Sequence, residues 1–185
     1  MRYFIDKIND YRYKISYNSF FQINPFVSSK LFELINNYAK KSRKVIDLYS
    51  GVGTLSINAS NRNVVTGVEV VKNAVDDAEY NKLINNKTKI NFICSDTKNI
   101  LTEITKNSDL IILDPPRAGV NKNVLDQIKK KKIKKIIYVS CNPFTLIRDL
   151  KILESHYEIE DIKVLDMFPY TKHIETIVLL SWRCR

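Results

Sequence analysis

Residues 44–56 read KVIDLYSGVGTLS, in which an apolar, β-branched run leads directly into a turn holding two of the chain's four glycines. A buried strand, a glycine-rich turn and the start of a helix together form the first unit of nucleotide-binding α/β proteins. Glycines in such a turn let backbone N–H groups come close to a ligand. The stretch therefore predicts a parallel α/β sheet with a ligand site where its first strand ends.

The rest of the chain repeats this alternation of short apolar runs and amphipathic stretches, which is typical of a parallel sheet covered by helices. Strands are predicted at 44–49, 63–70, 89–94, 109–114, 134–141, 157–168 and 173–182, and helices at 55–60, 73–85, 121–132 and 143–154. No helix-length segment separates the last two strands, so we expect an antiparallel hairpin there. The predicted fold is α/β: a Rossmann-like, seven-stranded, mostly parallel sheet with helices on both faces, an arrangement that favours methyltransferases over dehydrogenases.

The start of the chain has a different character from the alternating part. A strand pair is predicted at about 3–8 and 11–16, followed by a helix from about 26 to 40. Pro25 suits the first turn of that helix, where its missing N–H would have no partner. We therefore expect two parts, a leading element at 1–41 that contributes to the site and a catalytic domain at 42–185.

The charge of the chain indicates a polyanionic partner. Thirty Lys and Arg stand against twenty Asp and Glu, a formal charge of +10, and nucleic acid is the leading candidate. The densest basic run, IKKKKIKK at 128–135, either contacts phosphates or forms the solvated end of a helix. No apolar stretch is long enough to span a membrane, and the start lacks a secretory leader, so a cytoplasmic monomer is expected.

The three cysteines, Cys94, Cys141 and Cys184, are an odd number with no close pair. This spacing argues against a disulfide framework and against a metal or iron–sulfur site in this chain. We therefore expect any cysteine chemistry here to be that of a free thiol.

Polar residues near the glycine turn indicate a nucleotide-type cofactor. Gly51 lies in the turn, and Glu69 ends the second predicted strand, where an acid can accept hydrogen bonds from both ribose hydroxyls. Asp96 follows the third strand and would face an adenine. NAD fits the same pattern, but Ser56 replaces the third glycine of the dinucleotide fingerprint. S-adenosylmethionine is therefore favoured, and an NAD-dependent oxidoreductase is the rival interpretation.

Two motifs after the fourth and fifth predicted strands indicate the reaction. Asp114 opens a DPPR sequence in which Arg117 replaces the aromatic residue of amino-group methyltransferases. Cys141 follows the fifth strand beside a helix start, where the helix dipole favours a thiolate. A lone cysteine there is more often a buried residue, but methylating carbon 5 of a pyrimidine requires a nucleophile that adds to carbon 6. Cytosine-specific RNA enzymes carry a second cysteine in the DPPR position, so the pattern favours uridine.

A base must then remove the proton from carbon 5. Glu175 lies in the last predicted strand, between apolar neighbours, where an acid is unexpected unless it faces a site. His173 is the alternative base.

Taken together, these segments resemble the RNA 5-methyluridine (uracil-5) methyltransferases, whose members act on tRNA or 23S rRNA. The matching segments are SFFQIN (19–24), DLYSGVGTLS (47–56), GVEVVKNAVDDAEYN (67–81), DPPRAGV (114–120), YVSCNPFTLIRDL (138–150) and DMFPYTKHIE (166–175). The resemblance implies Cys141 as nucleophile and Glu175 as general base. It also implies cofactor or target contacts from Gln22, Tyr49, Thr54, Glu69, Asp96 and Asp114.

The resemblance has two departures. Ser50 stands where the family commonly has a cysteine. Full-length members usually add an N-terminal RNA-binding barrel and often an iron–sulfur region, which this sequence lacks, so we expect weak RNA affinity. The amino-acid sequences of the last two segments resemble the 23S rRNA type more than the tRNA type. Two alternatives stay open, a tRNA uracil-5 methyltransferase and a domain that binds cofactor and RNA without turnover.

Overall fold

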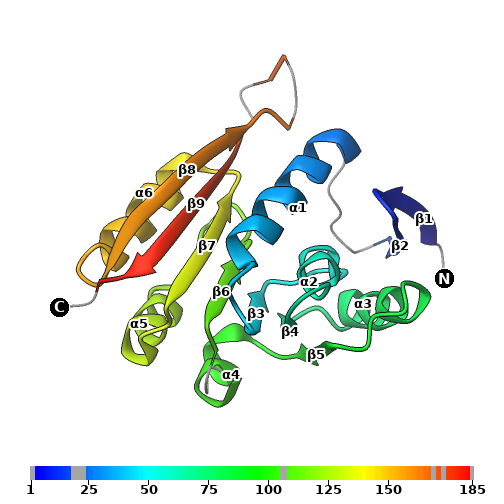
Figure 1. Ribbon diagram of the computed structural model, residues 1–185, viewed down its shortest axis with the longest axis horizontal. Helices are drawn as coiled ribbons and strands as arrows, with labels where there is room; N and C mark the ends of the chain where they lie inside the picture. The colour runs from blue at the N-terminus through cyan, green and yellow to red at the C-terminus, as the bar shows by residue number, and fades with distance from the viewer. Residues whose placement is uncertain (1–2, 18–23, 105–107, 168–169, 172–173, 184–185) are drawn as a thin grey trace.

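A computed structural model of the chain describes residues 3–17, 24–104, 108–167, 170–171 and 174–183. Its centre is a seven-stranded sheet in the order β5-β4-β3-β6-β7-β9-β8 (Figure 1). The strands are β3 (Lys44–Leu48), β4 (Val64–Glu69), β5 (Ile90–Cys94), β6 (Leu110–Leu113), β7 (Lys135–Ser140), β8 (Tyr157–Leu165) and β9 (Glu175–Trp182). Strands β3 to β7 pair in parallel, whereas β9 pairs antiparallel with both β7 and β8. The predicted mostly parallel sheet and its closing hairpin are confirmed.

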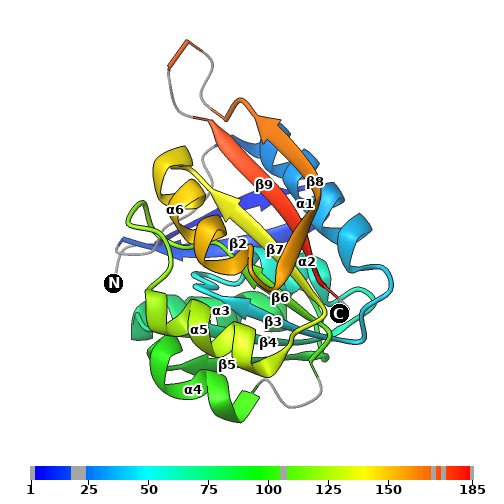
Figure 2. The same cartoon turned by 90° about the vertical axis from the view of Figure 1, so that its left-hand side faces the viewer.

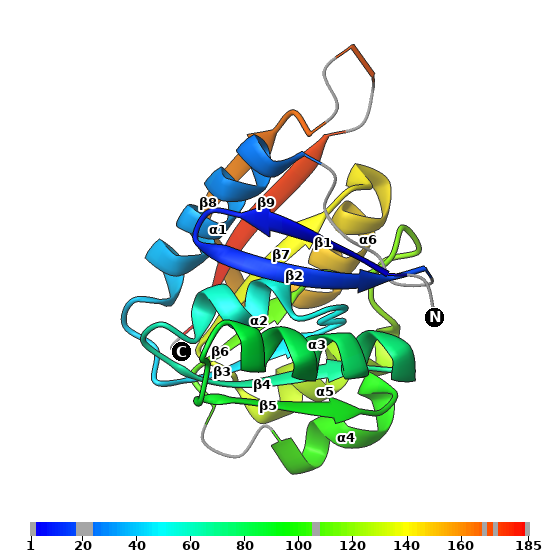
Figure 3. The same ribbon diagram turned by 90° about the vertical axis from the view of Figure 1, so that its right-hand side faces the viewer.

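Helices cover both faces of this sheet, as predicted. They are α1 (Pro25–Ala39), α2 (Thr54–Ala59), α3 (Lys72–Ile84), α4 (Thr97–Ile104), α5 (Lys122–Lys131) and α6 (Pro143–Leu153). Figure 2 shows α4, α5 and α6 on one face, and Figure 3 shows α2 and α3 on the other, together with the hairpin of β1 (Tyr3–Ile8) and β2 (Tyr11–Ser16). Within the described residues, no helix has the length and apolar character needed to cross a lipid bilayer.

The core is split by the sheet into two apolar clusters. Along β6, Leu110 and Ile112 pack into the cluster with α1, α2 and α3, while Ile111 and Leu113 pack into the cluster with α4, α5 and α6. All four side chains are fully buried. This burial on both faces explains why the central strands are almost entirely apolar in sequence.

Two features of the fold were not predicted. Helix α4 is a two-turn element whose only regular apolar contacts come from Ile100, Leu101 and Ile104, too few to stand out in the sequence. The last strand, β9, lies between β7 and β8 rather than at the edge of the sheet. The predicted division of the chain at residues 41 and 42 stays a prediction.

The hairpin at the start of the chain is joined to the α/β part by packing and by hydrogen bonds. Tyr13 and Ile15 of β2 are buried in the cluster that also contains Val75 and Ala78 of α3. The Asp77 carboxylate accepts hydrogen bonds from the backbone N–H and the hydroxyl of Ser16 at 2.8 and 2.9 Å. Helix α3 therefore fixes the edge of β2 above the sheet.

Candidate active site

The ends of four parallel strands and the start of β9 surround a cavity of about 560 Å³. Because β9 runs antiparallel to β7, its first residue lies at the same edge as the ends of the parallel strands. Ser140 pairs with Thr176 in this register, which sets Cys141 opposite Glu175. The lining includes seven of the residues predicted from the sequence: Tyr49, Gly51, Thr54, Glu69, Asp114, Cys141 and Glu175.

A smaller hollow of about 250 Å³ continues this site toward the ends of β4 and β5. It shares Tyr49 and Glu69 with the larger cavity and adds Asp96, the remaining predicted residue at this edge. The Asp96 carboxylate accepts a hydrogen bond from the Lys98 backbone N–H at 2.9 Å. An elongated ligand can therefore extend from Cys141 to Asp96. Gln22 and His173 lie outside the described residues.

The glycine turn needs its glycine at one position above all. Gly53 has φ +86°, and a Cβ there would lie 2.6 Å from the Phe92 ring. A larger residue is therefore excluded both by the left-handed backbone and by the packing of α2 onto the sheet. This turn leads directly into α2, whose first residue is Thr54.

Glu69 is held in place by three backbone donors. One carboxylate oxygen accepts from the Gly51 N–H at 3.1 Å, and the other accepts from the Val70 and Val71 N–H groups, each at 2.8 Å. The oxygen that accepts from Gly51 keeps acceptor capacity, because a carboxylate offers about four lone-pair sites and the three backbone donors use three of them. The side chain is thus oriented before any ligand arrives, as recognition of a pair of hydroxyls requires.

Three acids at or below the cavity have raised pKa values. Burial raises the pKa of the Glu175 carboxyl to about 7. Burial also raises the pKa of Asp114 well above its ordinary value, and the charges of Glu175 and Asp47 add to this. Asp47, fully buried at the end of β3, has a pKa of about 7 for the same reason, although the Ser56 hydroxyl donates to it at 2.6 Å. Ser56 therefore stabilises the Asp47 carboxyl group at the end of β3, beneath the site.

The Cys141 thiol corrects one sequence-based expectation. It directly precedes the N-cap of α6, Asn142, whose side chain accepts from the Phe144 N–H. Even so, burial raises the pKa of this thiol, and the nearby charge of Glu175 raises it further, while Arg117 lowers it. The expectation that the helix start favours the thiolate is wrong for the free protein, because burial and the neighbouring acids outweigh it.

Sequence reasoning missed Asn81, which links the hairpin, α3 and the glycine turn. Its side-chain amide donates to the backbone oxygens of Lys14 and Val52, both at 3.0 Å, and its oxygen accepts from the Lys14 N–H at 2.6 Å. A polar residue in the middle of a helix gives no sequence signal of this kind, because it is indistinguishable from a solvated one. Ser50 was noted only as a departure, yet its buried hydroxyl lines the cavity without a partner among the described residues.

We expect Asn81→Ala to lower the free energy of unfolding by about 2–4 kcal/mol, since it leaves buried partners in β2 and the glycine turn unsatisfied. Chemical denaturation measures this. The matched control is Asn85→Ala, which loses the same type of contact to the Arg12 backbone, at a partly buried position and without reaching the turn. Equal losses in both variants would show that the bond to Val52 contributes nothing.

Among the residues that the structure describes, no group of three or more His, Cys, Asp or Glu is arranged to hold a metal ion.

Comparison with known proteins places this site in context. The sequence model described as tRNA (Uracil-5-)-methyltransferase matches residues 5–183. An uncharacterised RNA methyltransferase of Clostridium acetobutylicum is 42% identical over 185 residues, covering 97% of this chain and 40% of the relative. One of Clostridium tetani is 41% identical over 180 residues, covering 95% of this chain and 40% of the relative. The chain thus spans about two fifths of the length of these relatives.

Among solved structures, the chain is similar to the tRNA (uracil-54, C5)-methyltransferase of Pyrococcus abyssi, crystallised in complex with S-adenosyl-L-homocysteine. The sequences are 35% identical and the TM-score is 0.88, over 96% of this chain and 44% of the archaeal one. The two proteins therefore share both the fold and clear sequence similarity in the part that this chain spans.

Proposed function

The chain belongs to the tRNA (uracil-5-)-methyltransferase family, and from this premise we propose that it transfers a methyl group from S-adenosylmethionine to carbon 5 of a uridine in RNA. The single observation that carries the proposal is the meeting of Cys141, Glu175 and Asp114 with the glycine turn in one cavity. A thiol and an acid with a pKa near 7 are the two groups that this reaction needs.

The residues present fit S-adenosylmethionine, which when bound supplies an electrophilic methyl group. The cavity volume of about 560 Å³ lies in the usual range for small-molecule sites. The buried Ser50 hydroxyl, without a partner among the described residues, offers a polar contact, and Glu69 is oriented to accept from ribose hydroxyls. We propose that Tyr49, Gly51, Thr54, Glu69, Asp96 and Asp114 hold this cofactor, with Gln22 a further predicted contact.

The proposed reaction begins at Cys141. The thiol first loses its proton, and its sulfur then forms a bond to carbon 6 of the uracil while the electrons of the 5,6 double bond move to the carbonyl oxygen at carbon 4. The resulting enolate makes carbon 5 nucleophilic, and carbon 5 would take the methyl group as the bond between that group and the cofactor sulfur breaks. Glu175 then removes the proton from carbon 5, the double bond re-forms, and the carbon–sulfur bond breaks to release Cys141.

The RNA that carries this uridine is the finer part of the proposal. The sequences SCNPFTLIRDL and DMFP favour 23S rRNA as the substrate. The matching family model and the archaeal structure are both described as tRNA methyltransferases, which favours tRNA. We propose 23S rRNA and keep tRNA as the alternative. A second candidate function is binding of cofactor and RNA without turnover, which the raised pKa of the Cys141 thiol favours. Measurable cofactor binding without methyl transfer to any RNA would favour it.

The pH dependence of methyl transfer tests the proposal. Glu175 acts as a base only when ionised, and its pKa is raised to about 7. The Cys141 thiol, whose pKa is also raised, ionises further as the pH rises. We expect the rate of methyl incorporation into unmodified RNA to rise by more than about tenfold per pH unit below pH 7, where both groups ionise further, and by up to about tenfold per pH unit above it, where only the thiol still does. A rate that stays constant between pH 5.5 and pH 8, measured with methyl-labelled cofactor, would contradict these roles.

A further inference from the structure

The charge near the cavity does not match an RNA substrate. Three acids, Glu69, Asp114 and Glu175, line it, and among the lining residues that the structure describes Arg117 is the only base. The adjoining hollow adds one acid and one base, Asp96 and Lys98. Among the described residues that line the cavity and the hollow, a polyanion therefore meets only two bases, although the whole chain carries a net charge of +10.

Basic residues gather at the opposite edge of the sheet, where the parallel strands begin. Arg43 and Lys44 lie at the start of β3, and Lys89 immediately precedes β5. Backbone hydrogen bonds hold these strand starts together: the Arg43 oxygen accepts from the Val64 N–H and the Lys89 oxygen from the Val65 N–H, both at 2.9 Å. These side chains are exposed, and the strand order β5-β4-β3 places their residues along one edge of the sheet.

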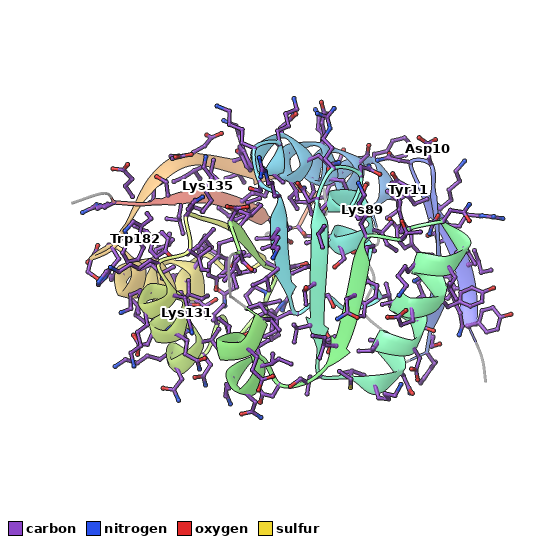
Figure 4. The ribbon with its side chains drawn as sticks, turned by 60° about the horizontal axis from the view of Figure 1, so that its bottom comes forward. Asp10, Tyr11, Lys89, Lys131, Lys135 and Trp182 are labelled. Atoms are coloured by element: carbon purple, nitrogen blue, oxygen red, sulfur yellow. The ribbon has the colours of Figure 1, made fainter. Side chains whose placement is uncertain are left out.

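Further basic residues lie at the same edge in the other half of the sheet. Lys132 caps the end of α5, Lys134 precedes β7, and Arg183 follows β9. The Lys134 oxygen accepts from the Trp182 N–H at 2.9 Å, so β7 and β9 meet at this edge. We call the six exposed residues Arg43, Lys44, Lys89, Lys132, Lys134 and Arg183 the basic edge. Figure 4 labels Lys89 of the basic edge, and also Lys131 and Lys135, the neighbours of Lys132 and Lys134 in the sequence.

Few acids neutralise the basic edge. Asp109 forms an ion pair with Lys134 at 3.1 Å and also accepts from the Arg43 backbone N–H. For Arg43, Lys44, Lys89, Lys132 and Arg183, no described carboxylate lies within ion-pair distance. The run at 128–135 is thus only one part of a surface assembled from four chain segments.

We propose that the basic edge binds the phosphate backbone of a second segment of the substrate RNA, away from the target uridine. This inference rests on the proposed function for the identity of the partner. Strands of five to six residues separate the two edges by roughly 20 Å, about twice the Debye length in physiological salt. A strand of about four nucleotides, which spans roughly 14 Å when stacked, fills the cavity without reaching the basic edge, whereas a folded RNA reaches it. The surface therefore selects large, structured RNA over short oligonucleotides.

The test compares two variants with equal changes in charge. The first, Lys44→Glu/Lys89→Glu/Lys132→Glu, reverses half of the basic edge. The control, Lys30→Glu/Lys72→Glu/Lys163→Glu, reverses three exposed lysines on α1, α3 and β8. Binding of each protein to a structured transcript of several hundred nucleotides and to a uridine-containing 4-nucleotide strand, about the shortest length that one small domain covers, is measured over a range of salt concentrations.

We expect the basic-edge variant to bind the transcript at least about tenfold more weakly in 0.1 M salt, with the slope of log K against log[salt] reduced by about 2 to 3. Its affinity for the short strand is expected to stay within about twofold of wild type. Equal losses in both variants, or an unchanged salt slope, would overturn the inference. If the triple variant does not fold, the double variant Lys89→Glu/Lys132→Glu replaces it, with a smaller change of slope.

The two proposals fail in different ways. If the wild-type protein methylates the short strand but does not bind the transcript more tightly, the proposed function is supported and RNA binding by the basic edge is contradicted. If the protein shows the expected salt dependence but transfers no methyl group, RNA binding by the basic edge is supported and the proposed function is contradicted.

Discussion

Cys141→Ala is expected to lower the rate of methyl transfer to RNA by about 10⁴-fold or more, since removal of a covalent nucleophile leaves only binding and positioning. Carbon 5 of uracil is a poor nucleophile until a sulfur atom is bonded to carbon 6. No other described cysteine lines the cavity that contains Cys141, so no neighbouring thiol can replace it. Transfer of labelled methyl groups to unmodified RNA measures the loss.

The matched control is Cys94→Ala, at the end of β5. Cys94 is a free, exposed thiol whose sulfur lies 3.7 Å from the Val70 oxygen, and it does not line the cavity. It should retain nearly full activity. Both variants should also bind S-adenosylmethionine as wild type does, which separates loss of chemistry from loss of the cofactor site. Full activity of Cys141→Ala would show that Cys141 is not the nucleophile.

Glu175→Gln is expected to block the last chemical step and to trap the protein on its RNA. The amide cannot take the proton from carbon 5, so the carbon–sulfur bond formed by Cys141 is not released. A covalent protein–RNA adduct should accumulate, visible as a band that resists denaturing electrophoresis and disappears in the double variant with Cys141→Ala. Glu158→Gln on the exposed side of β8 is the control and should turn over without an adduct.

The Glu175→Gln variant is also expected to change the stability of the protein. Measuring this change shows whether the variant is folded. Glu175 is 6% exposed, and burial raises its pKa from 4.5 to about 7. An acid whose folded pKa is raised destabilises the protein progressively as the pH rises from 4.5 to 7, and the full cost, roughly 3 kcal/mol, is present above pH 7. Glu175→Gln should therefore be more stable than wild type at pH 8 and similar at pH 4.5. A variant that is less stable at pH 8 and forms no adduct would contradict the role of Glu175.

Much of this site could be predicted because its residues lie at strand ends. Once residues 44–56 indicate a parallel sheet, everything at the carboxyl ends of its strands is expected on one edge. Glu69, Asp96, Asp114 and Cys141 were placed this way. Glu175 needed a further step, since only an antiparallel last strand brings its first residue to that edge.

Other features depend on contacts that no local pattern encodes. The three hydrogen bonds of Asn81 join segments 67 and 29 residues apart in sequence. The pKa of Cys141 depends on how deeply β7 ends below the surface and on Glu175 across the strand pair, so the helix-start argument gave the wrong direction. The basic edge likewise appears only when four separate segments are assembled by the sheet.

The central claim is methylation of uridine at carbon 5 through Cys141. Its most direct test is incubation of the protein with unmodified total RNA and methyl-labelled S-adenosylmethionine, followed by digestion and mapping of the labelled nucleotide. The account predicts 5-methyluridine at a defined position, absent when Cys141→Ala replaces wild type. Label on any other atom or base, or 5-methyluridine formed equally well by the alanine variant, would contradict it.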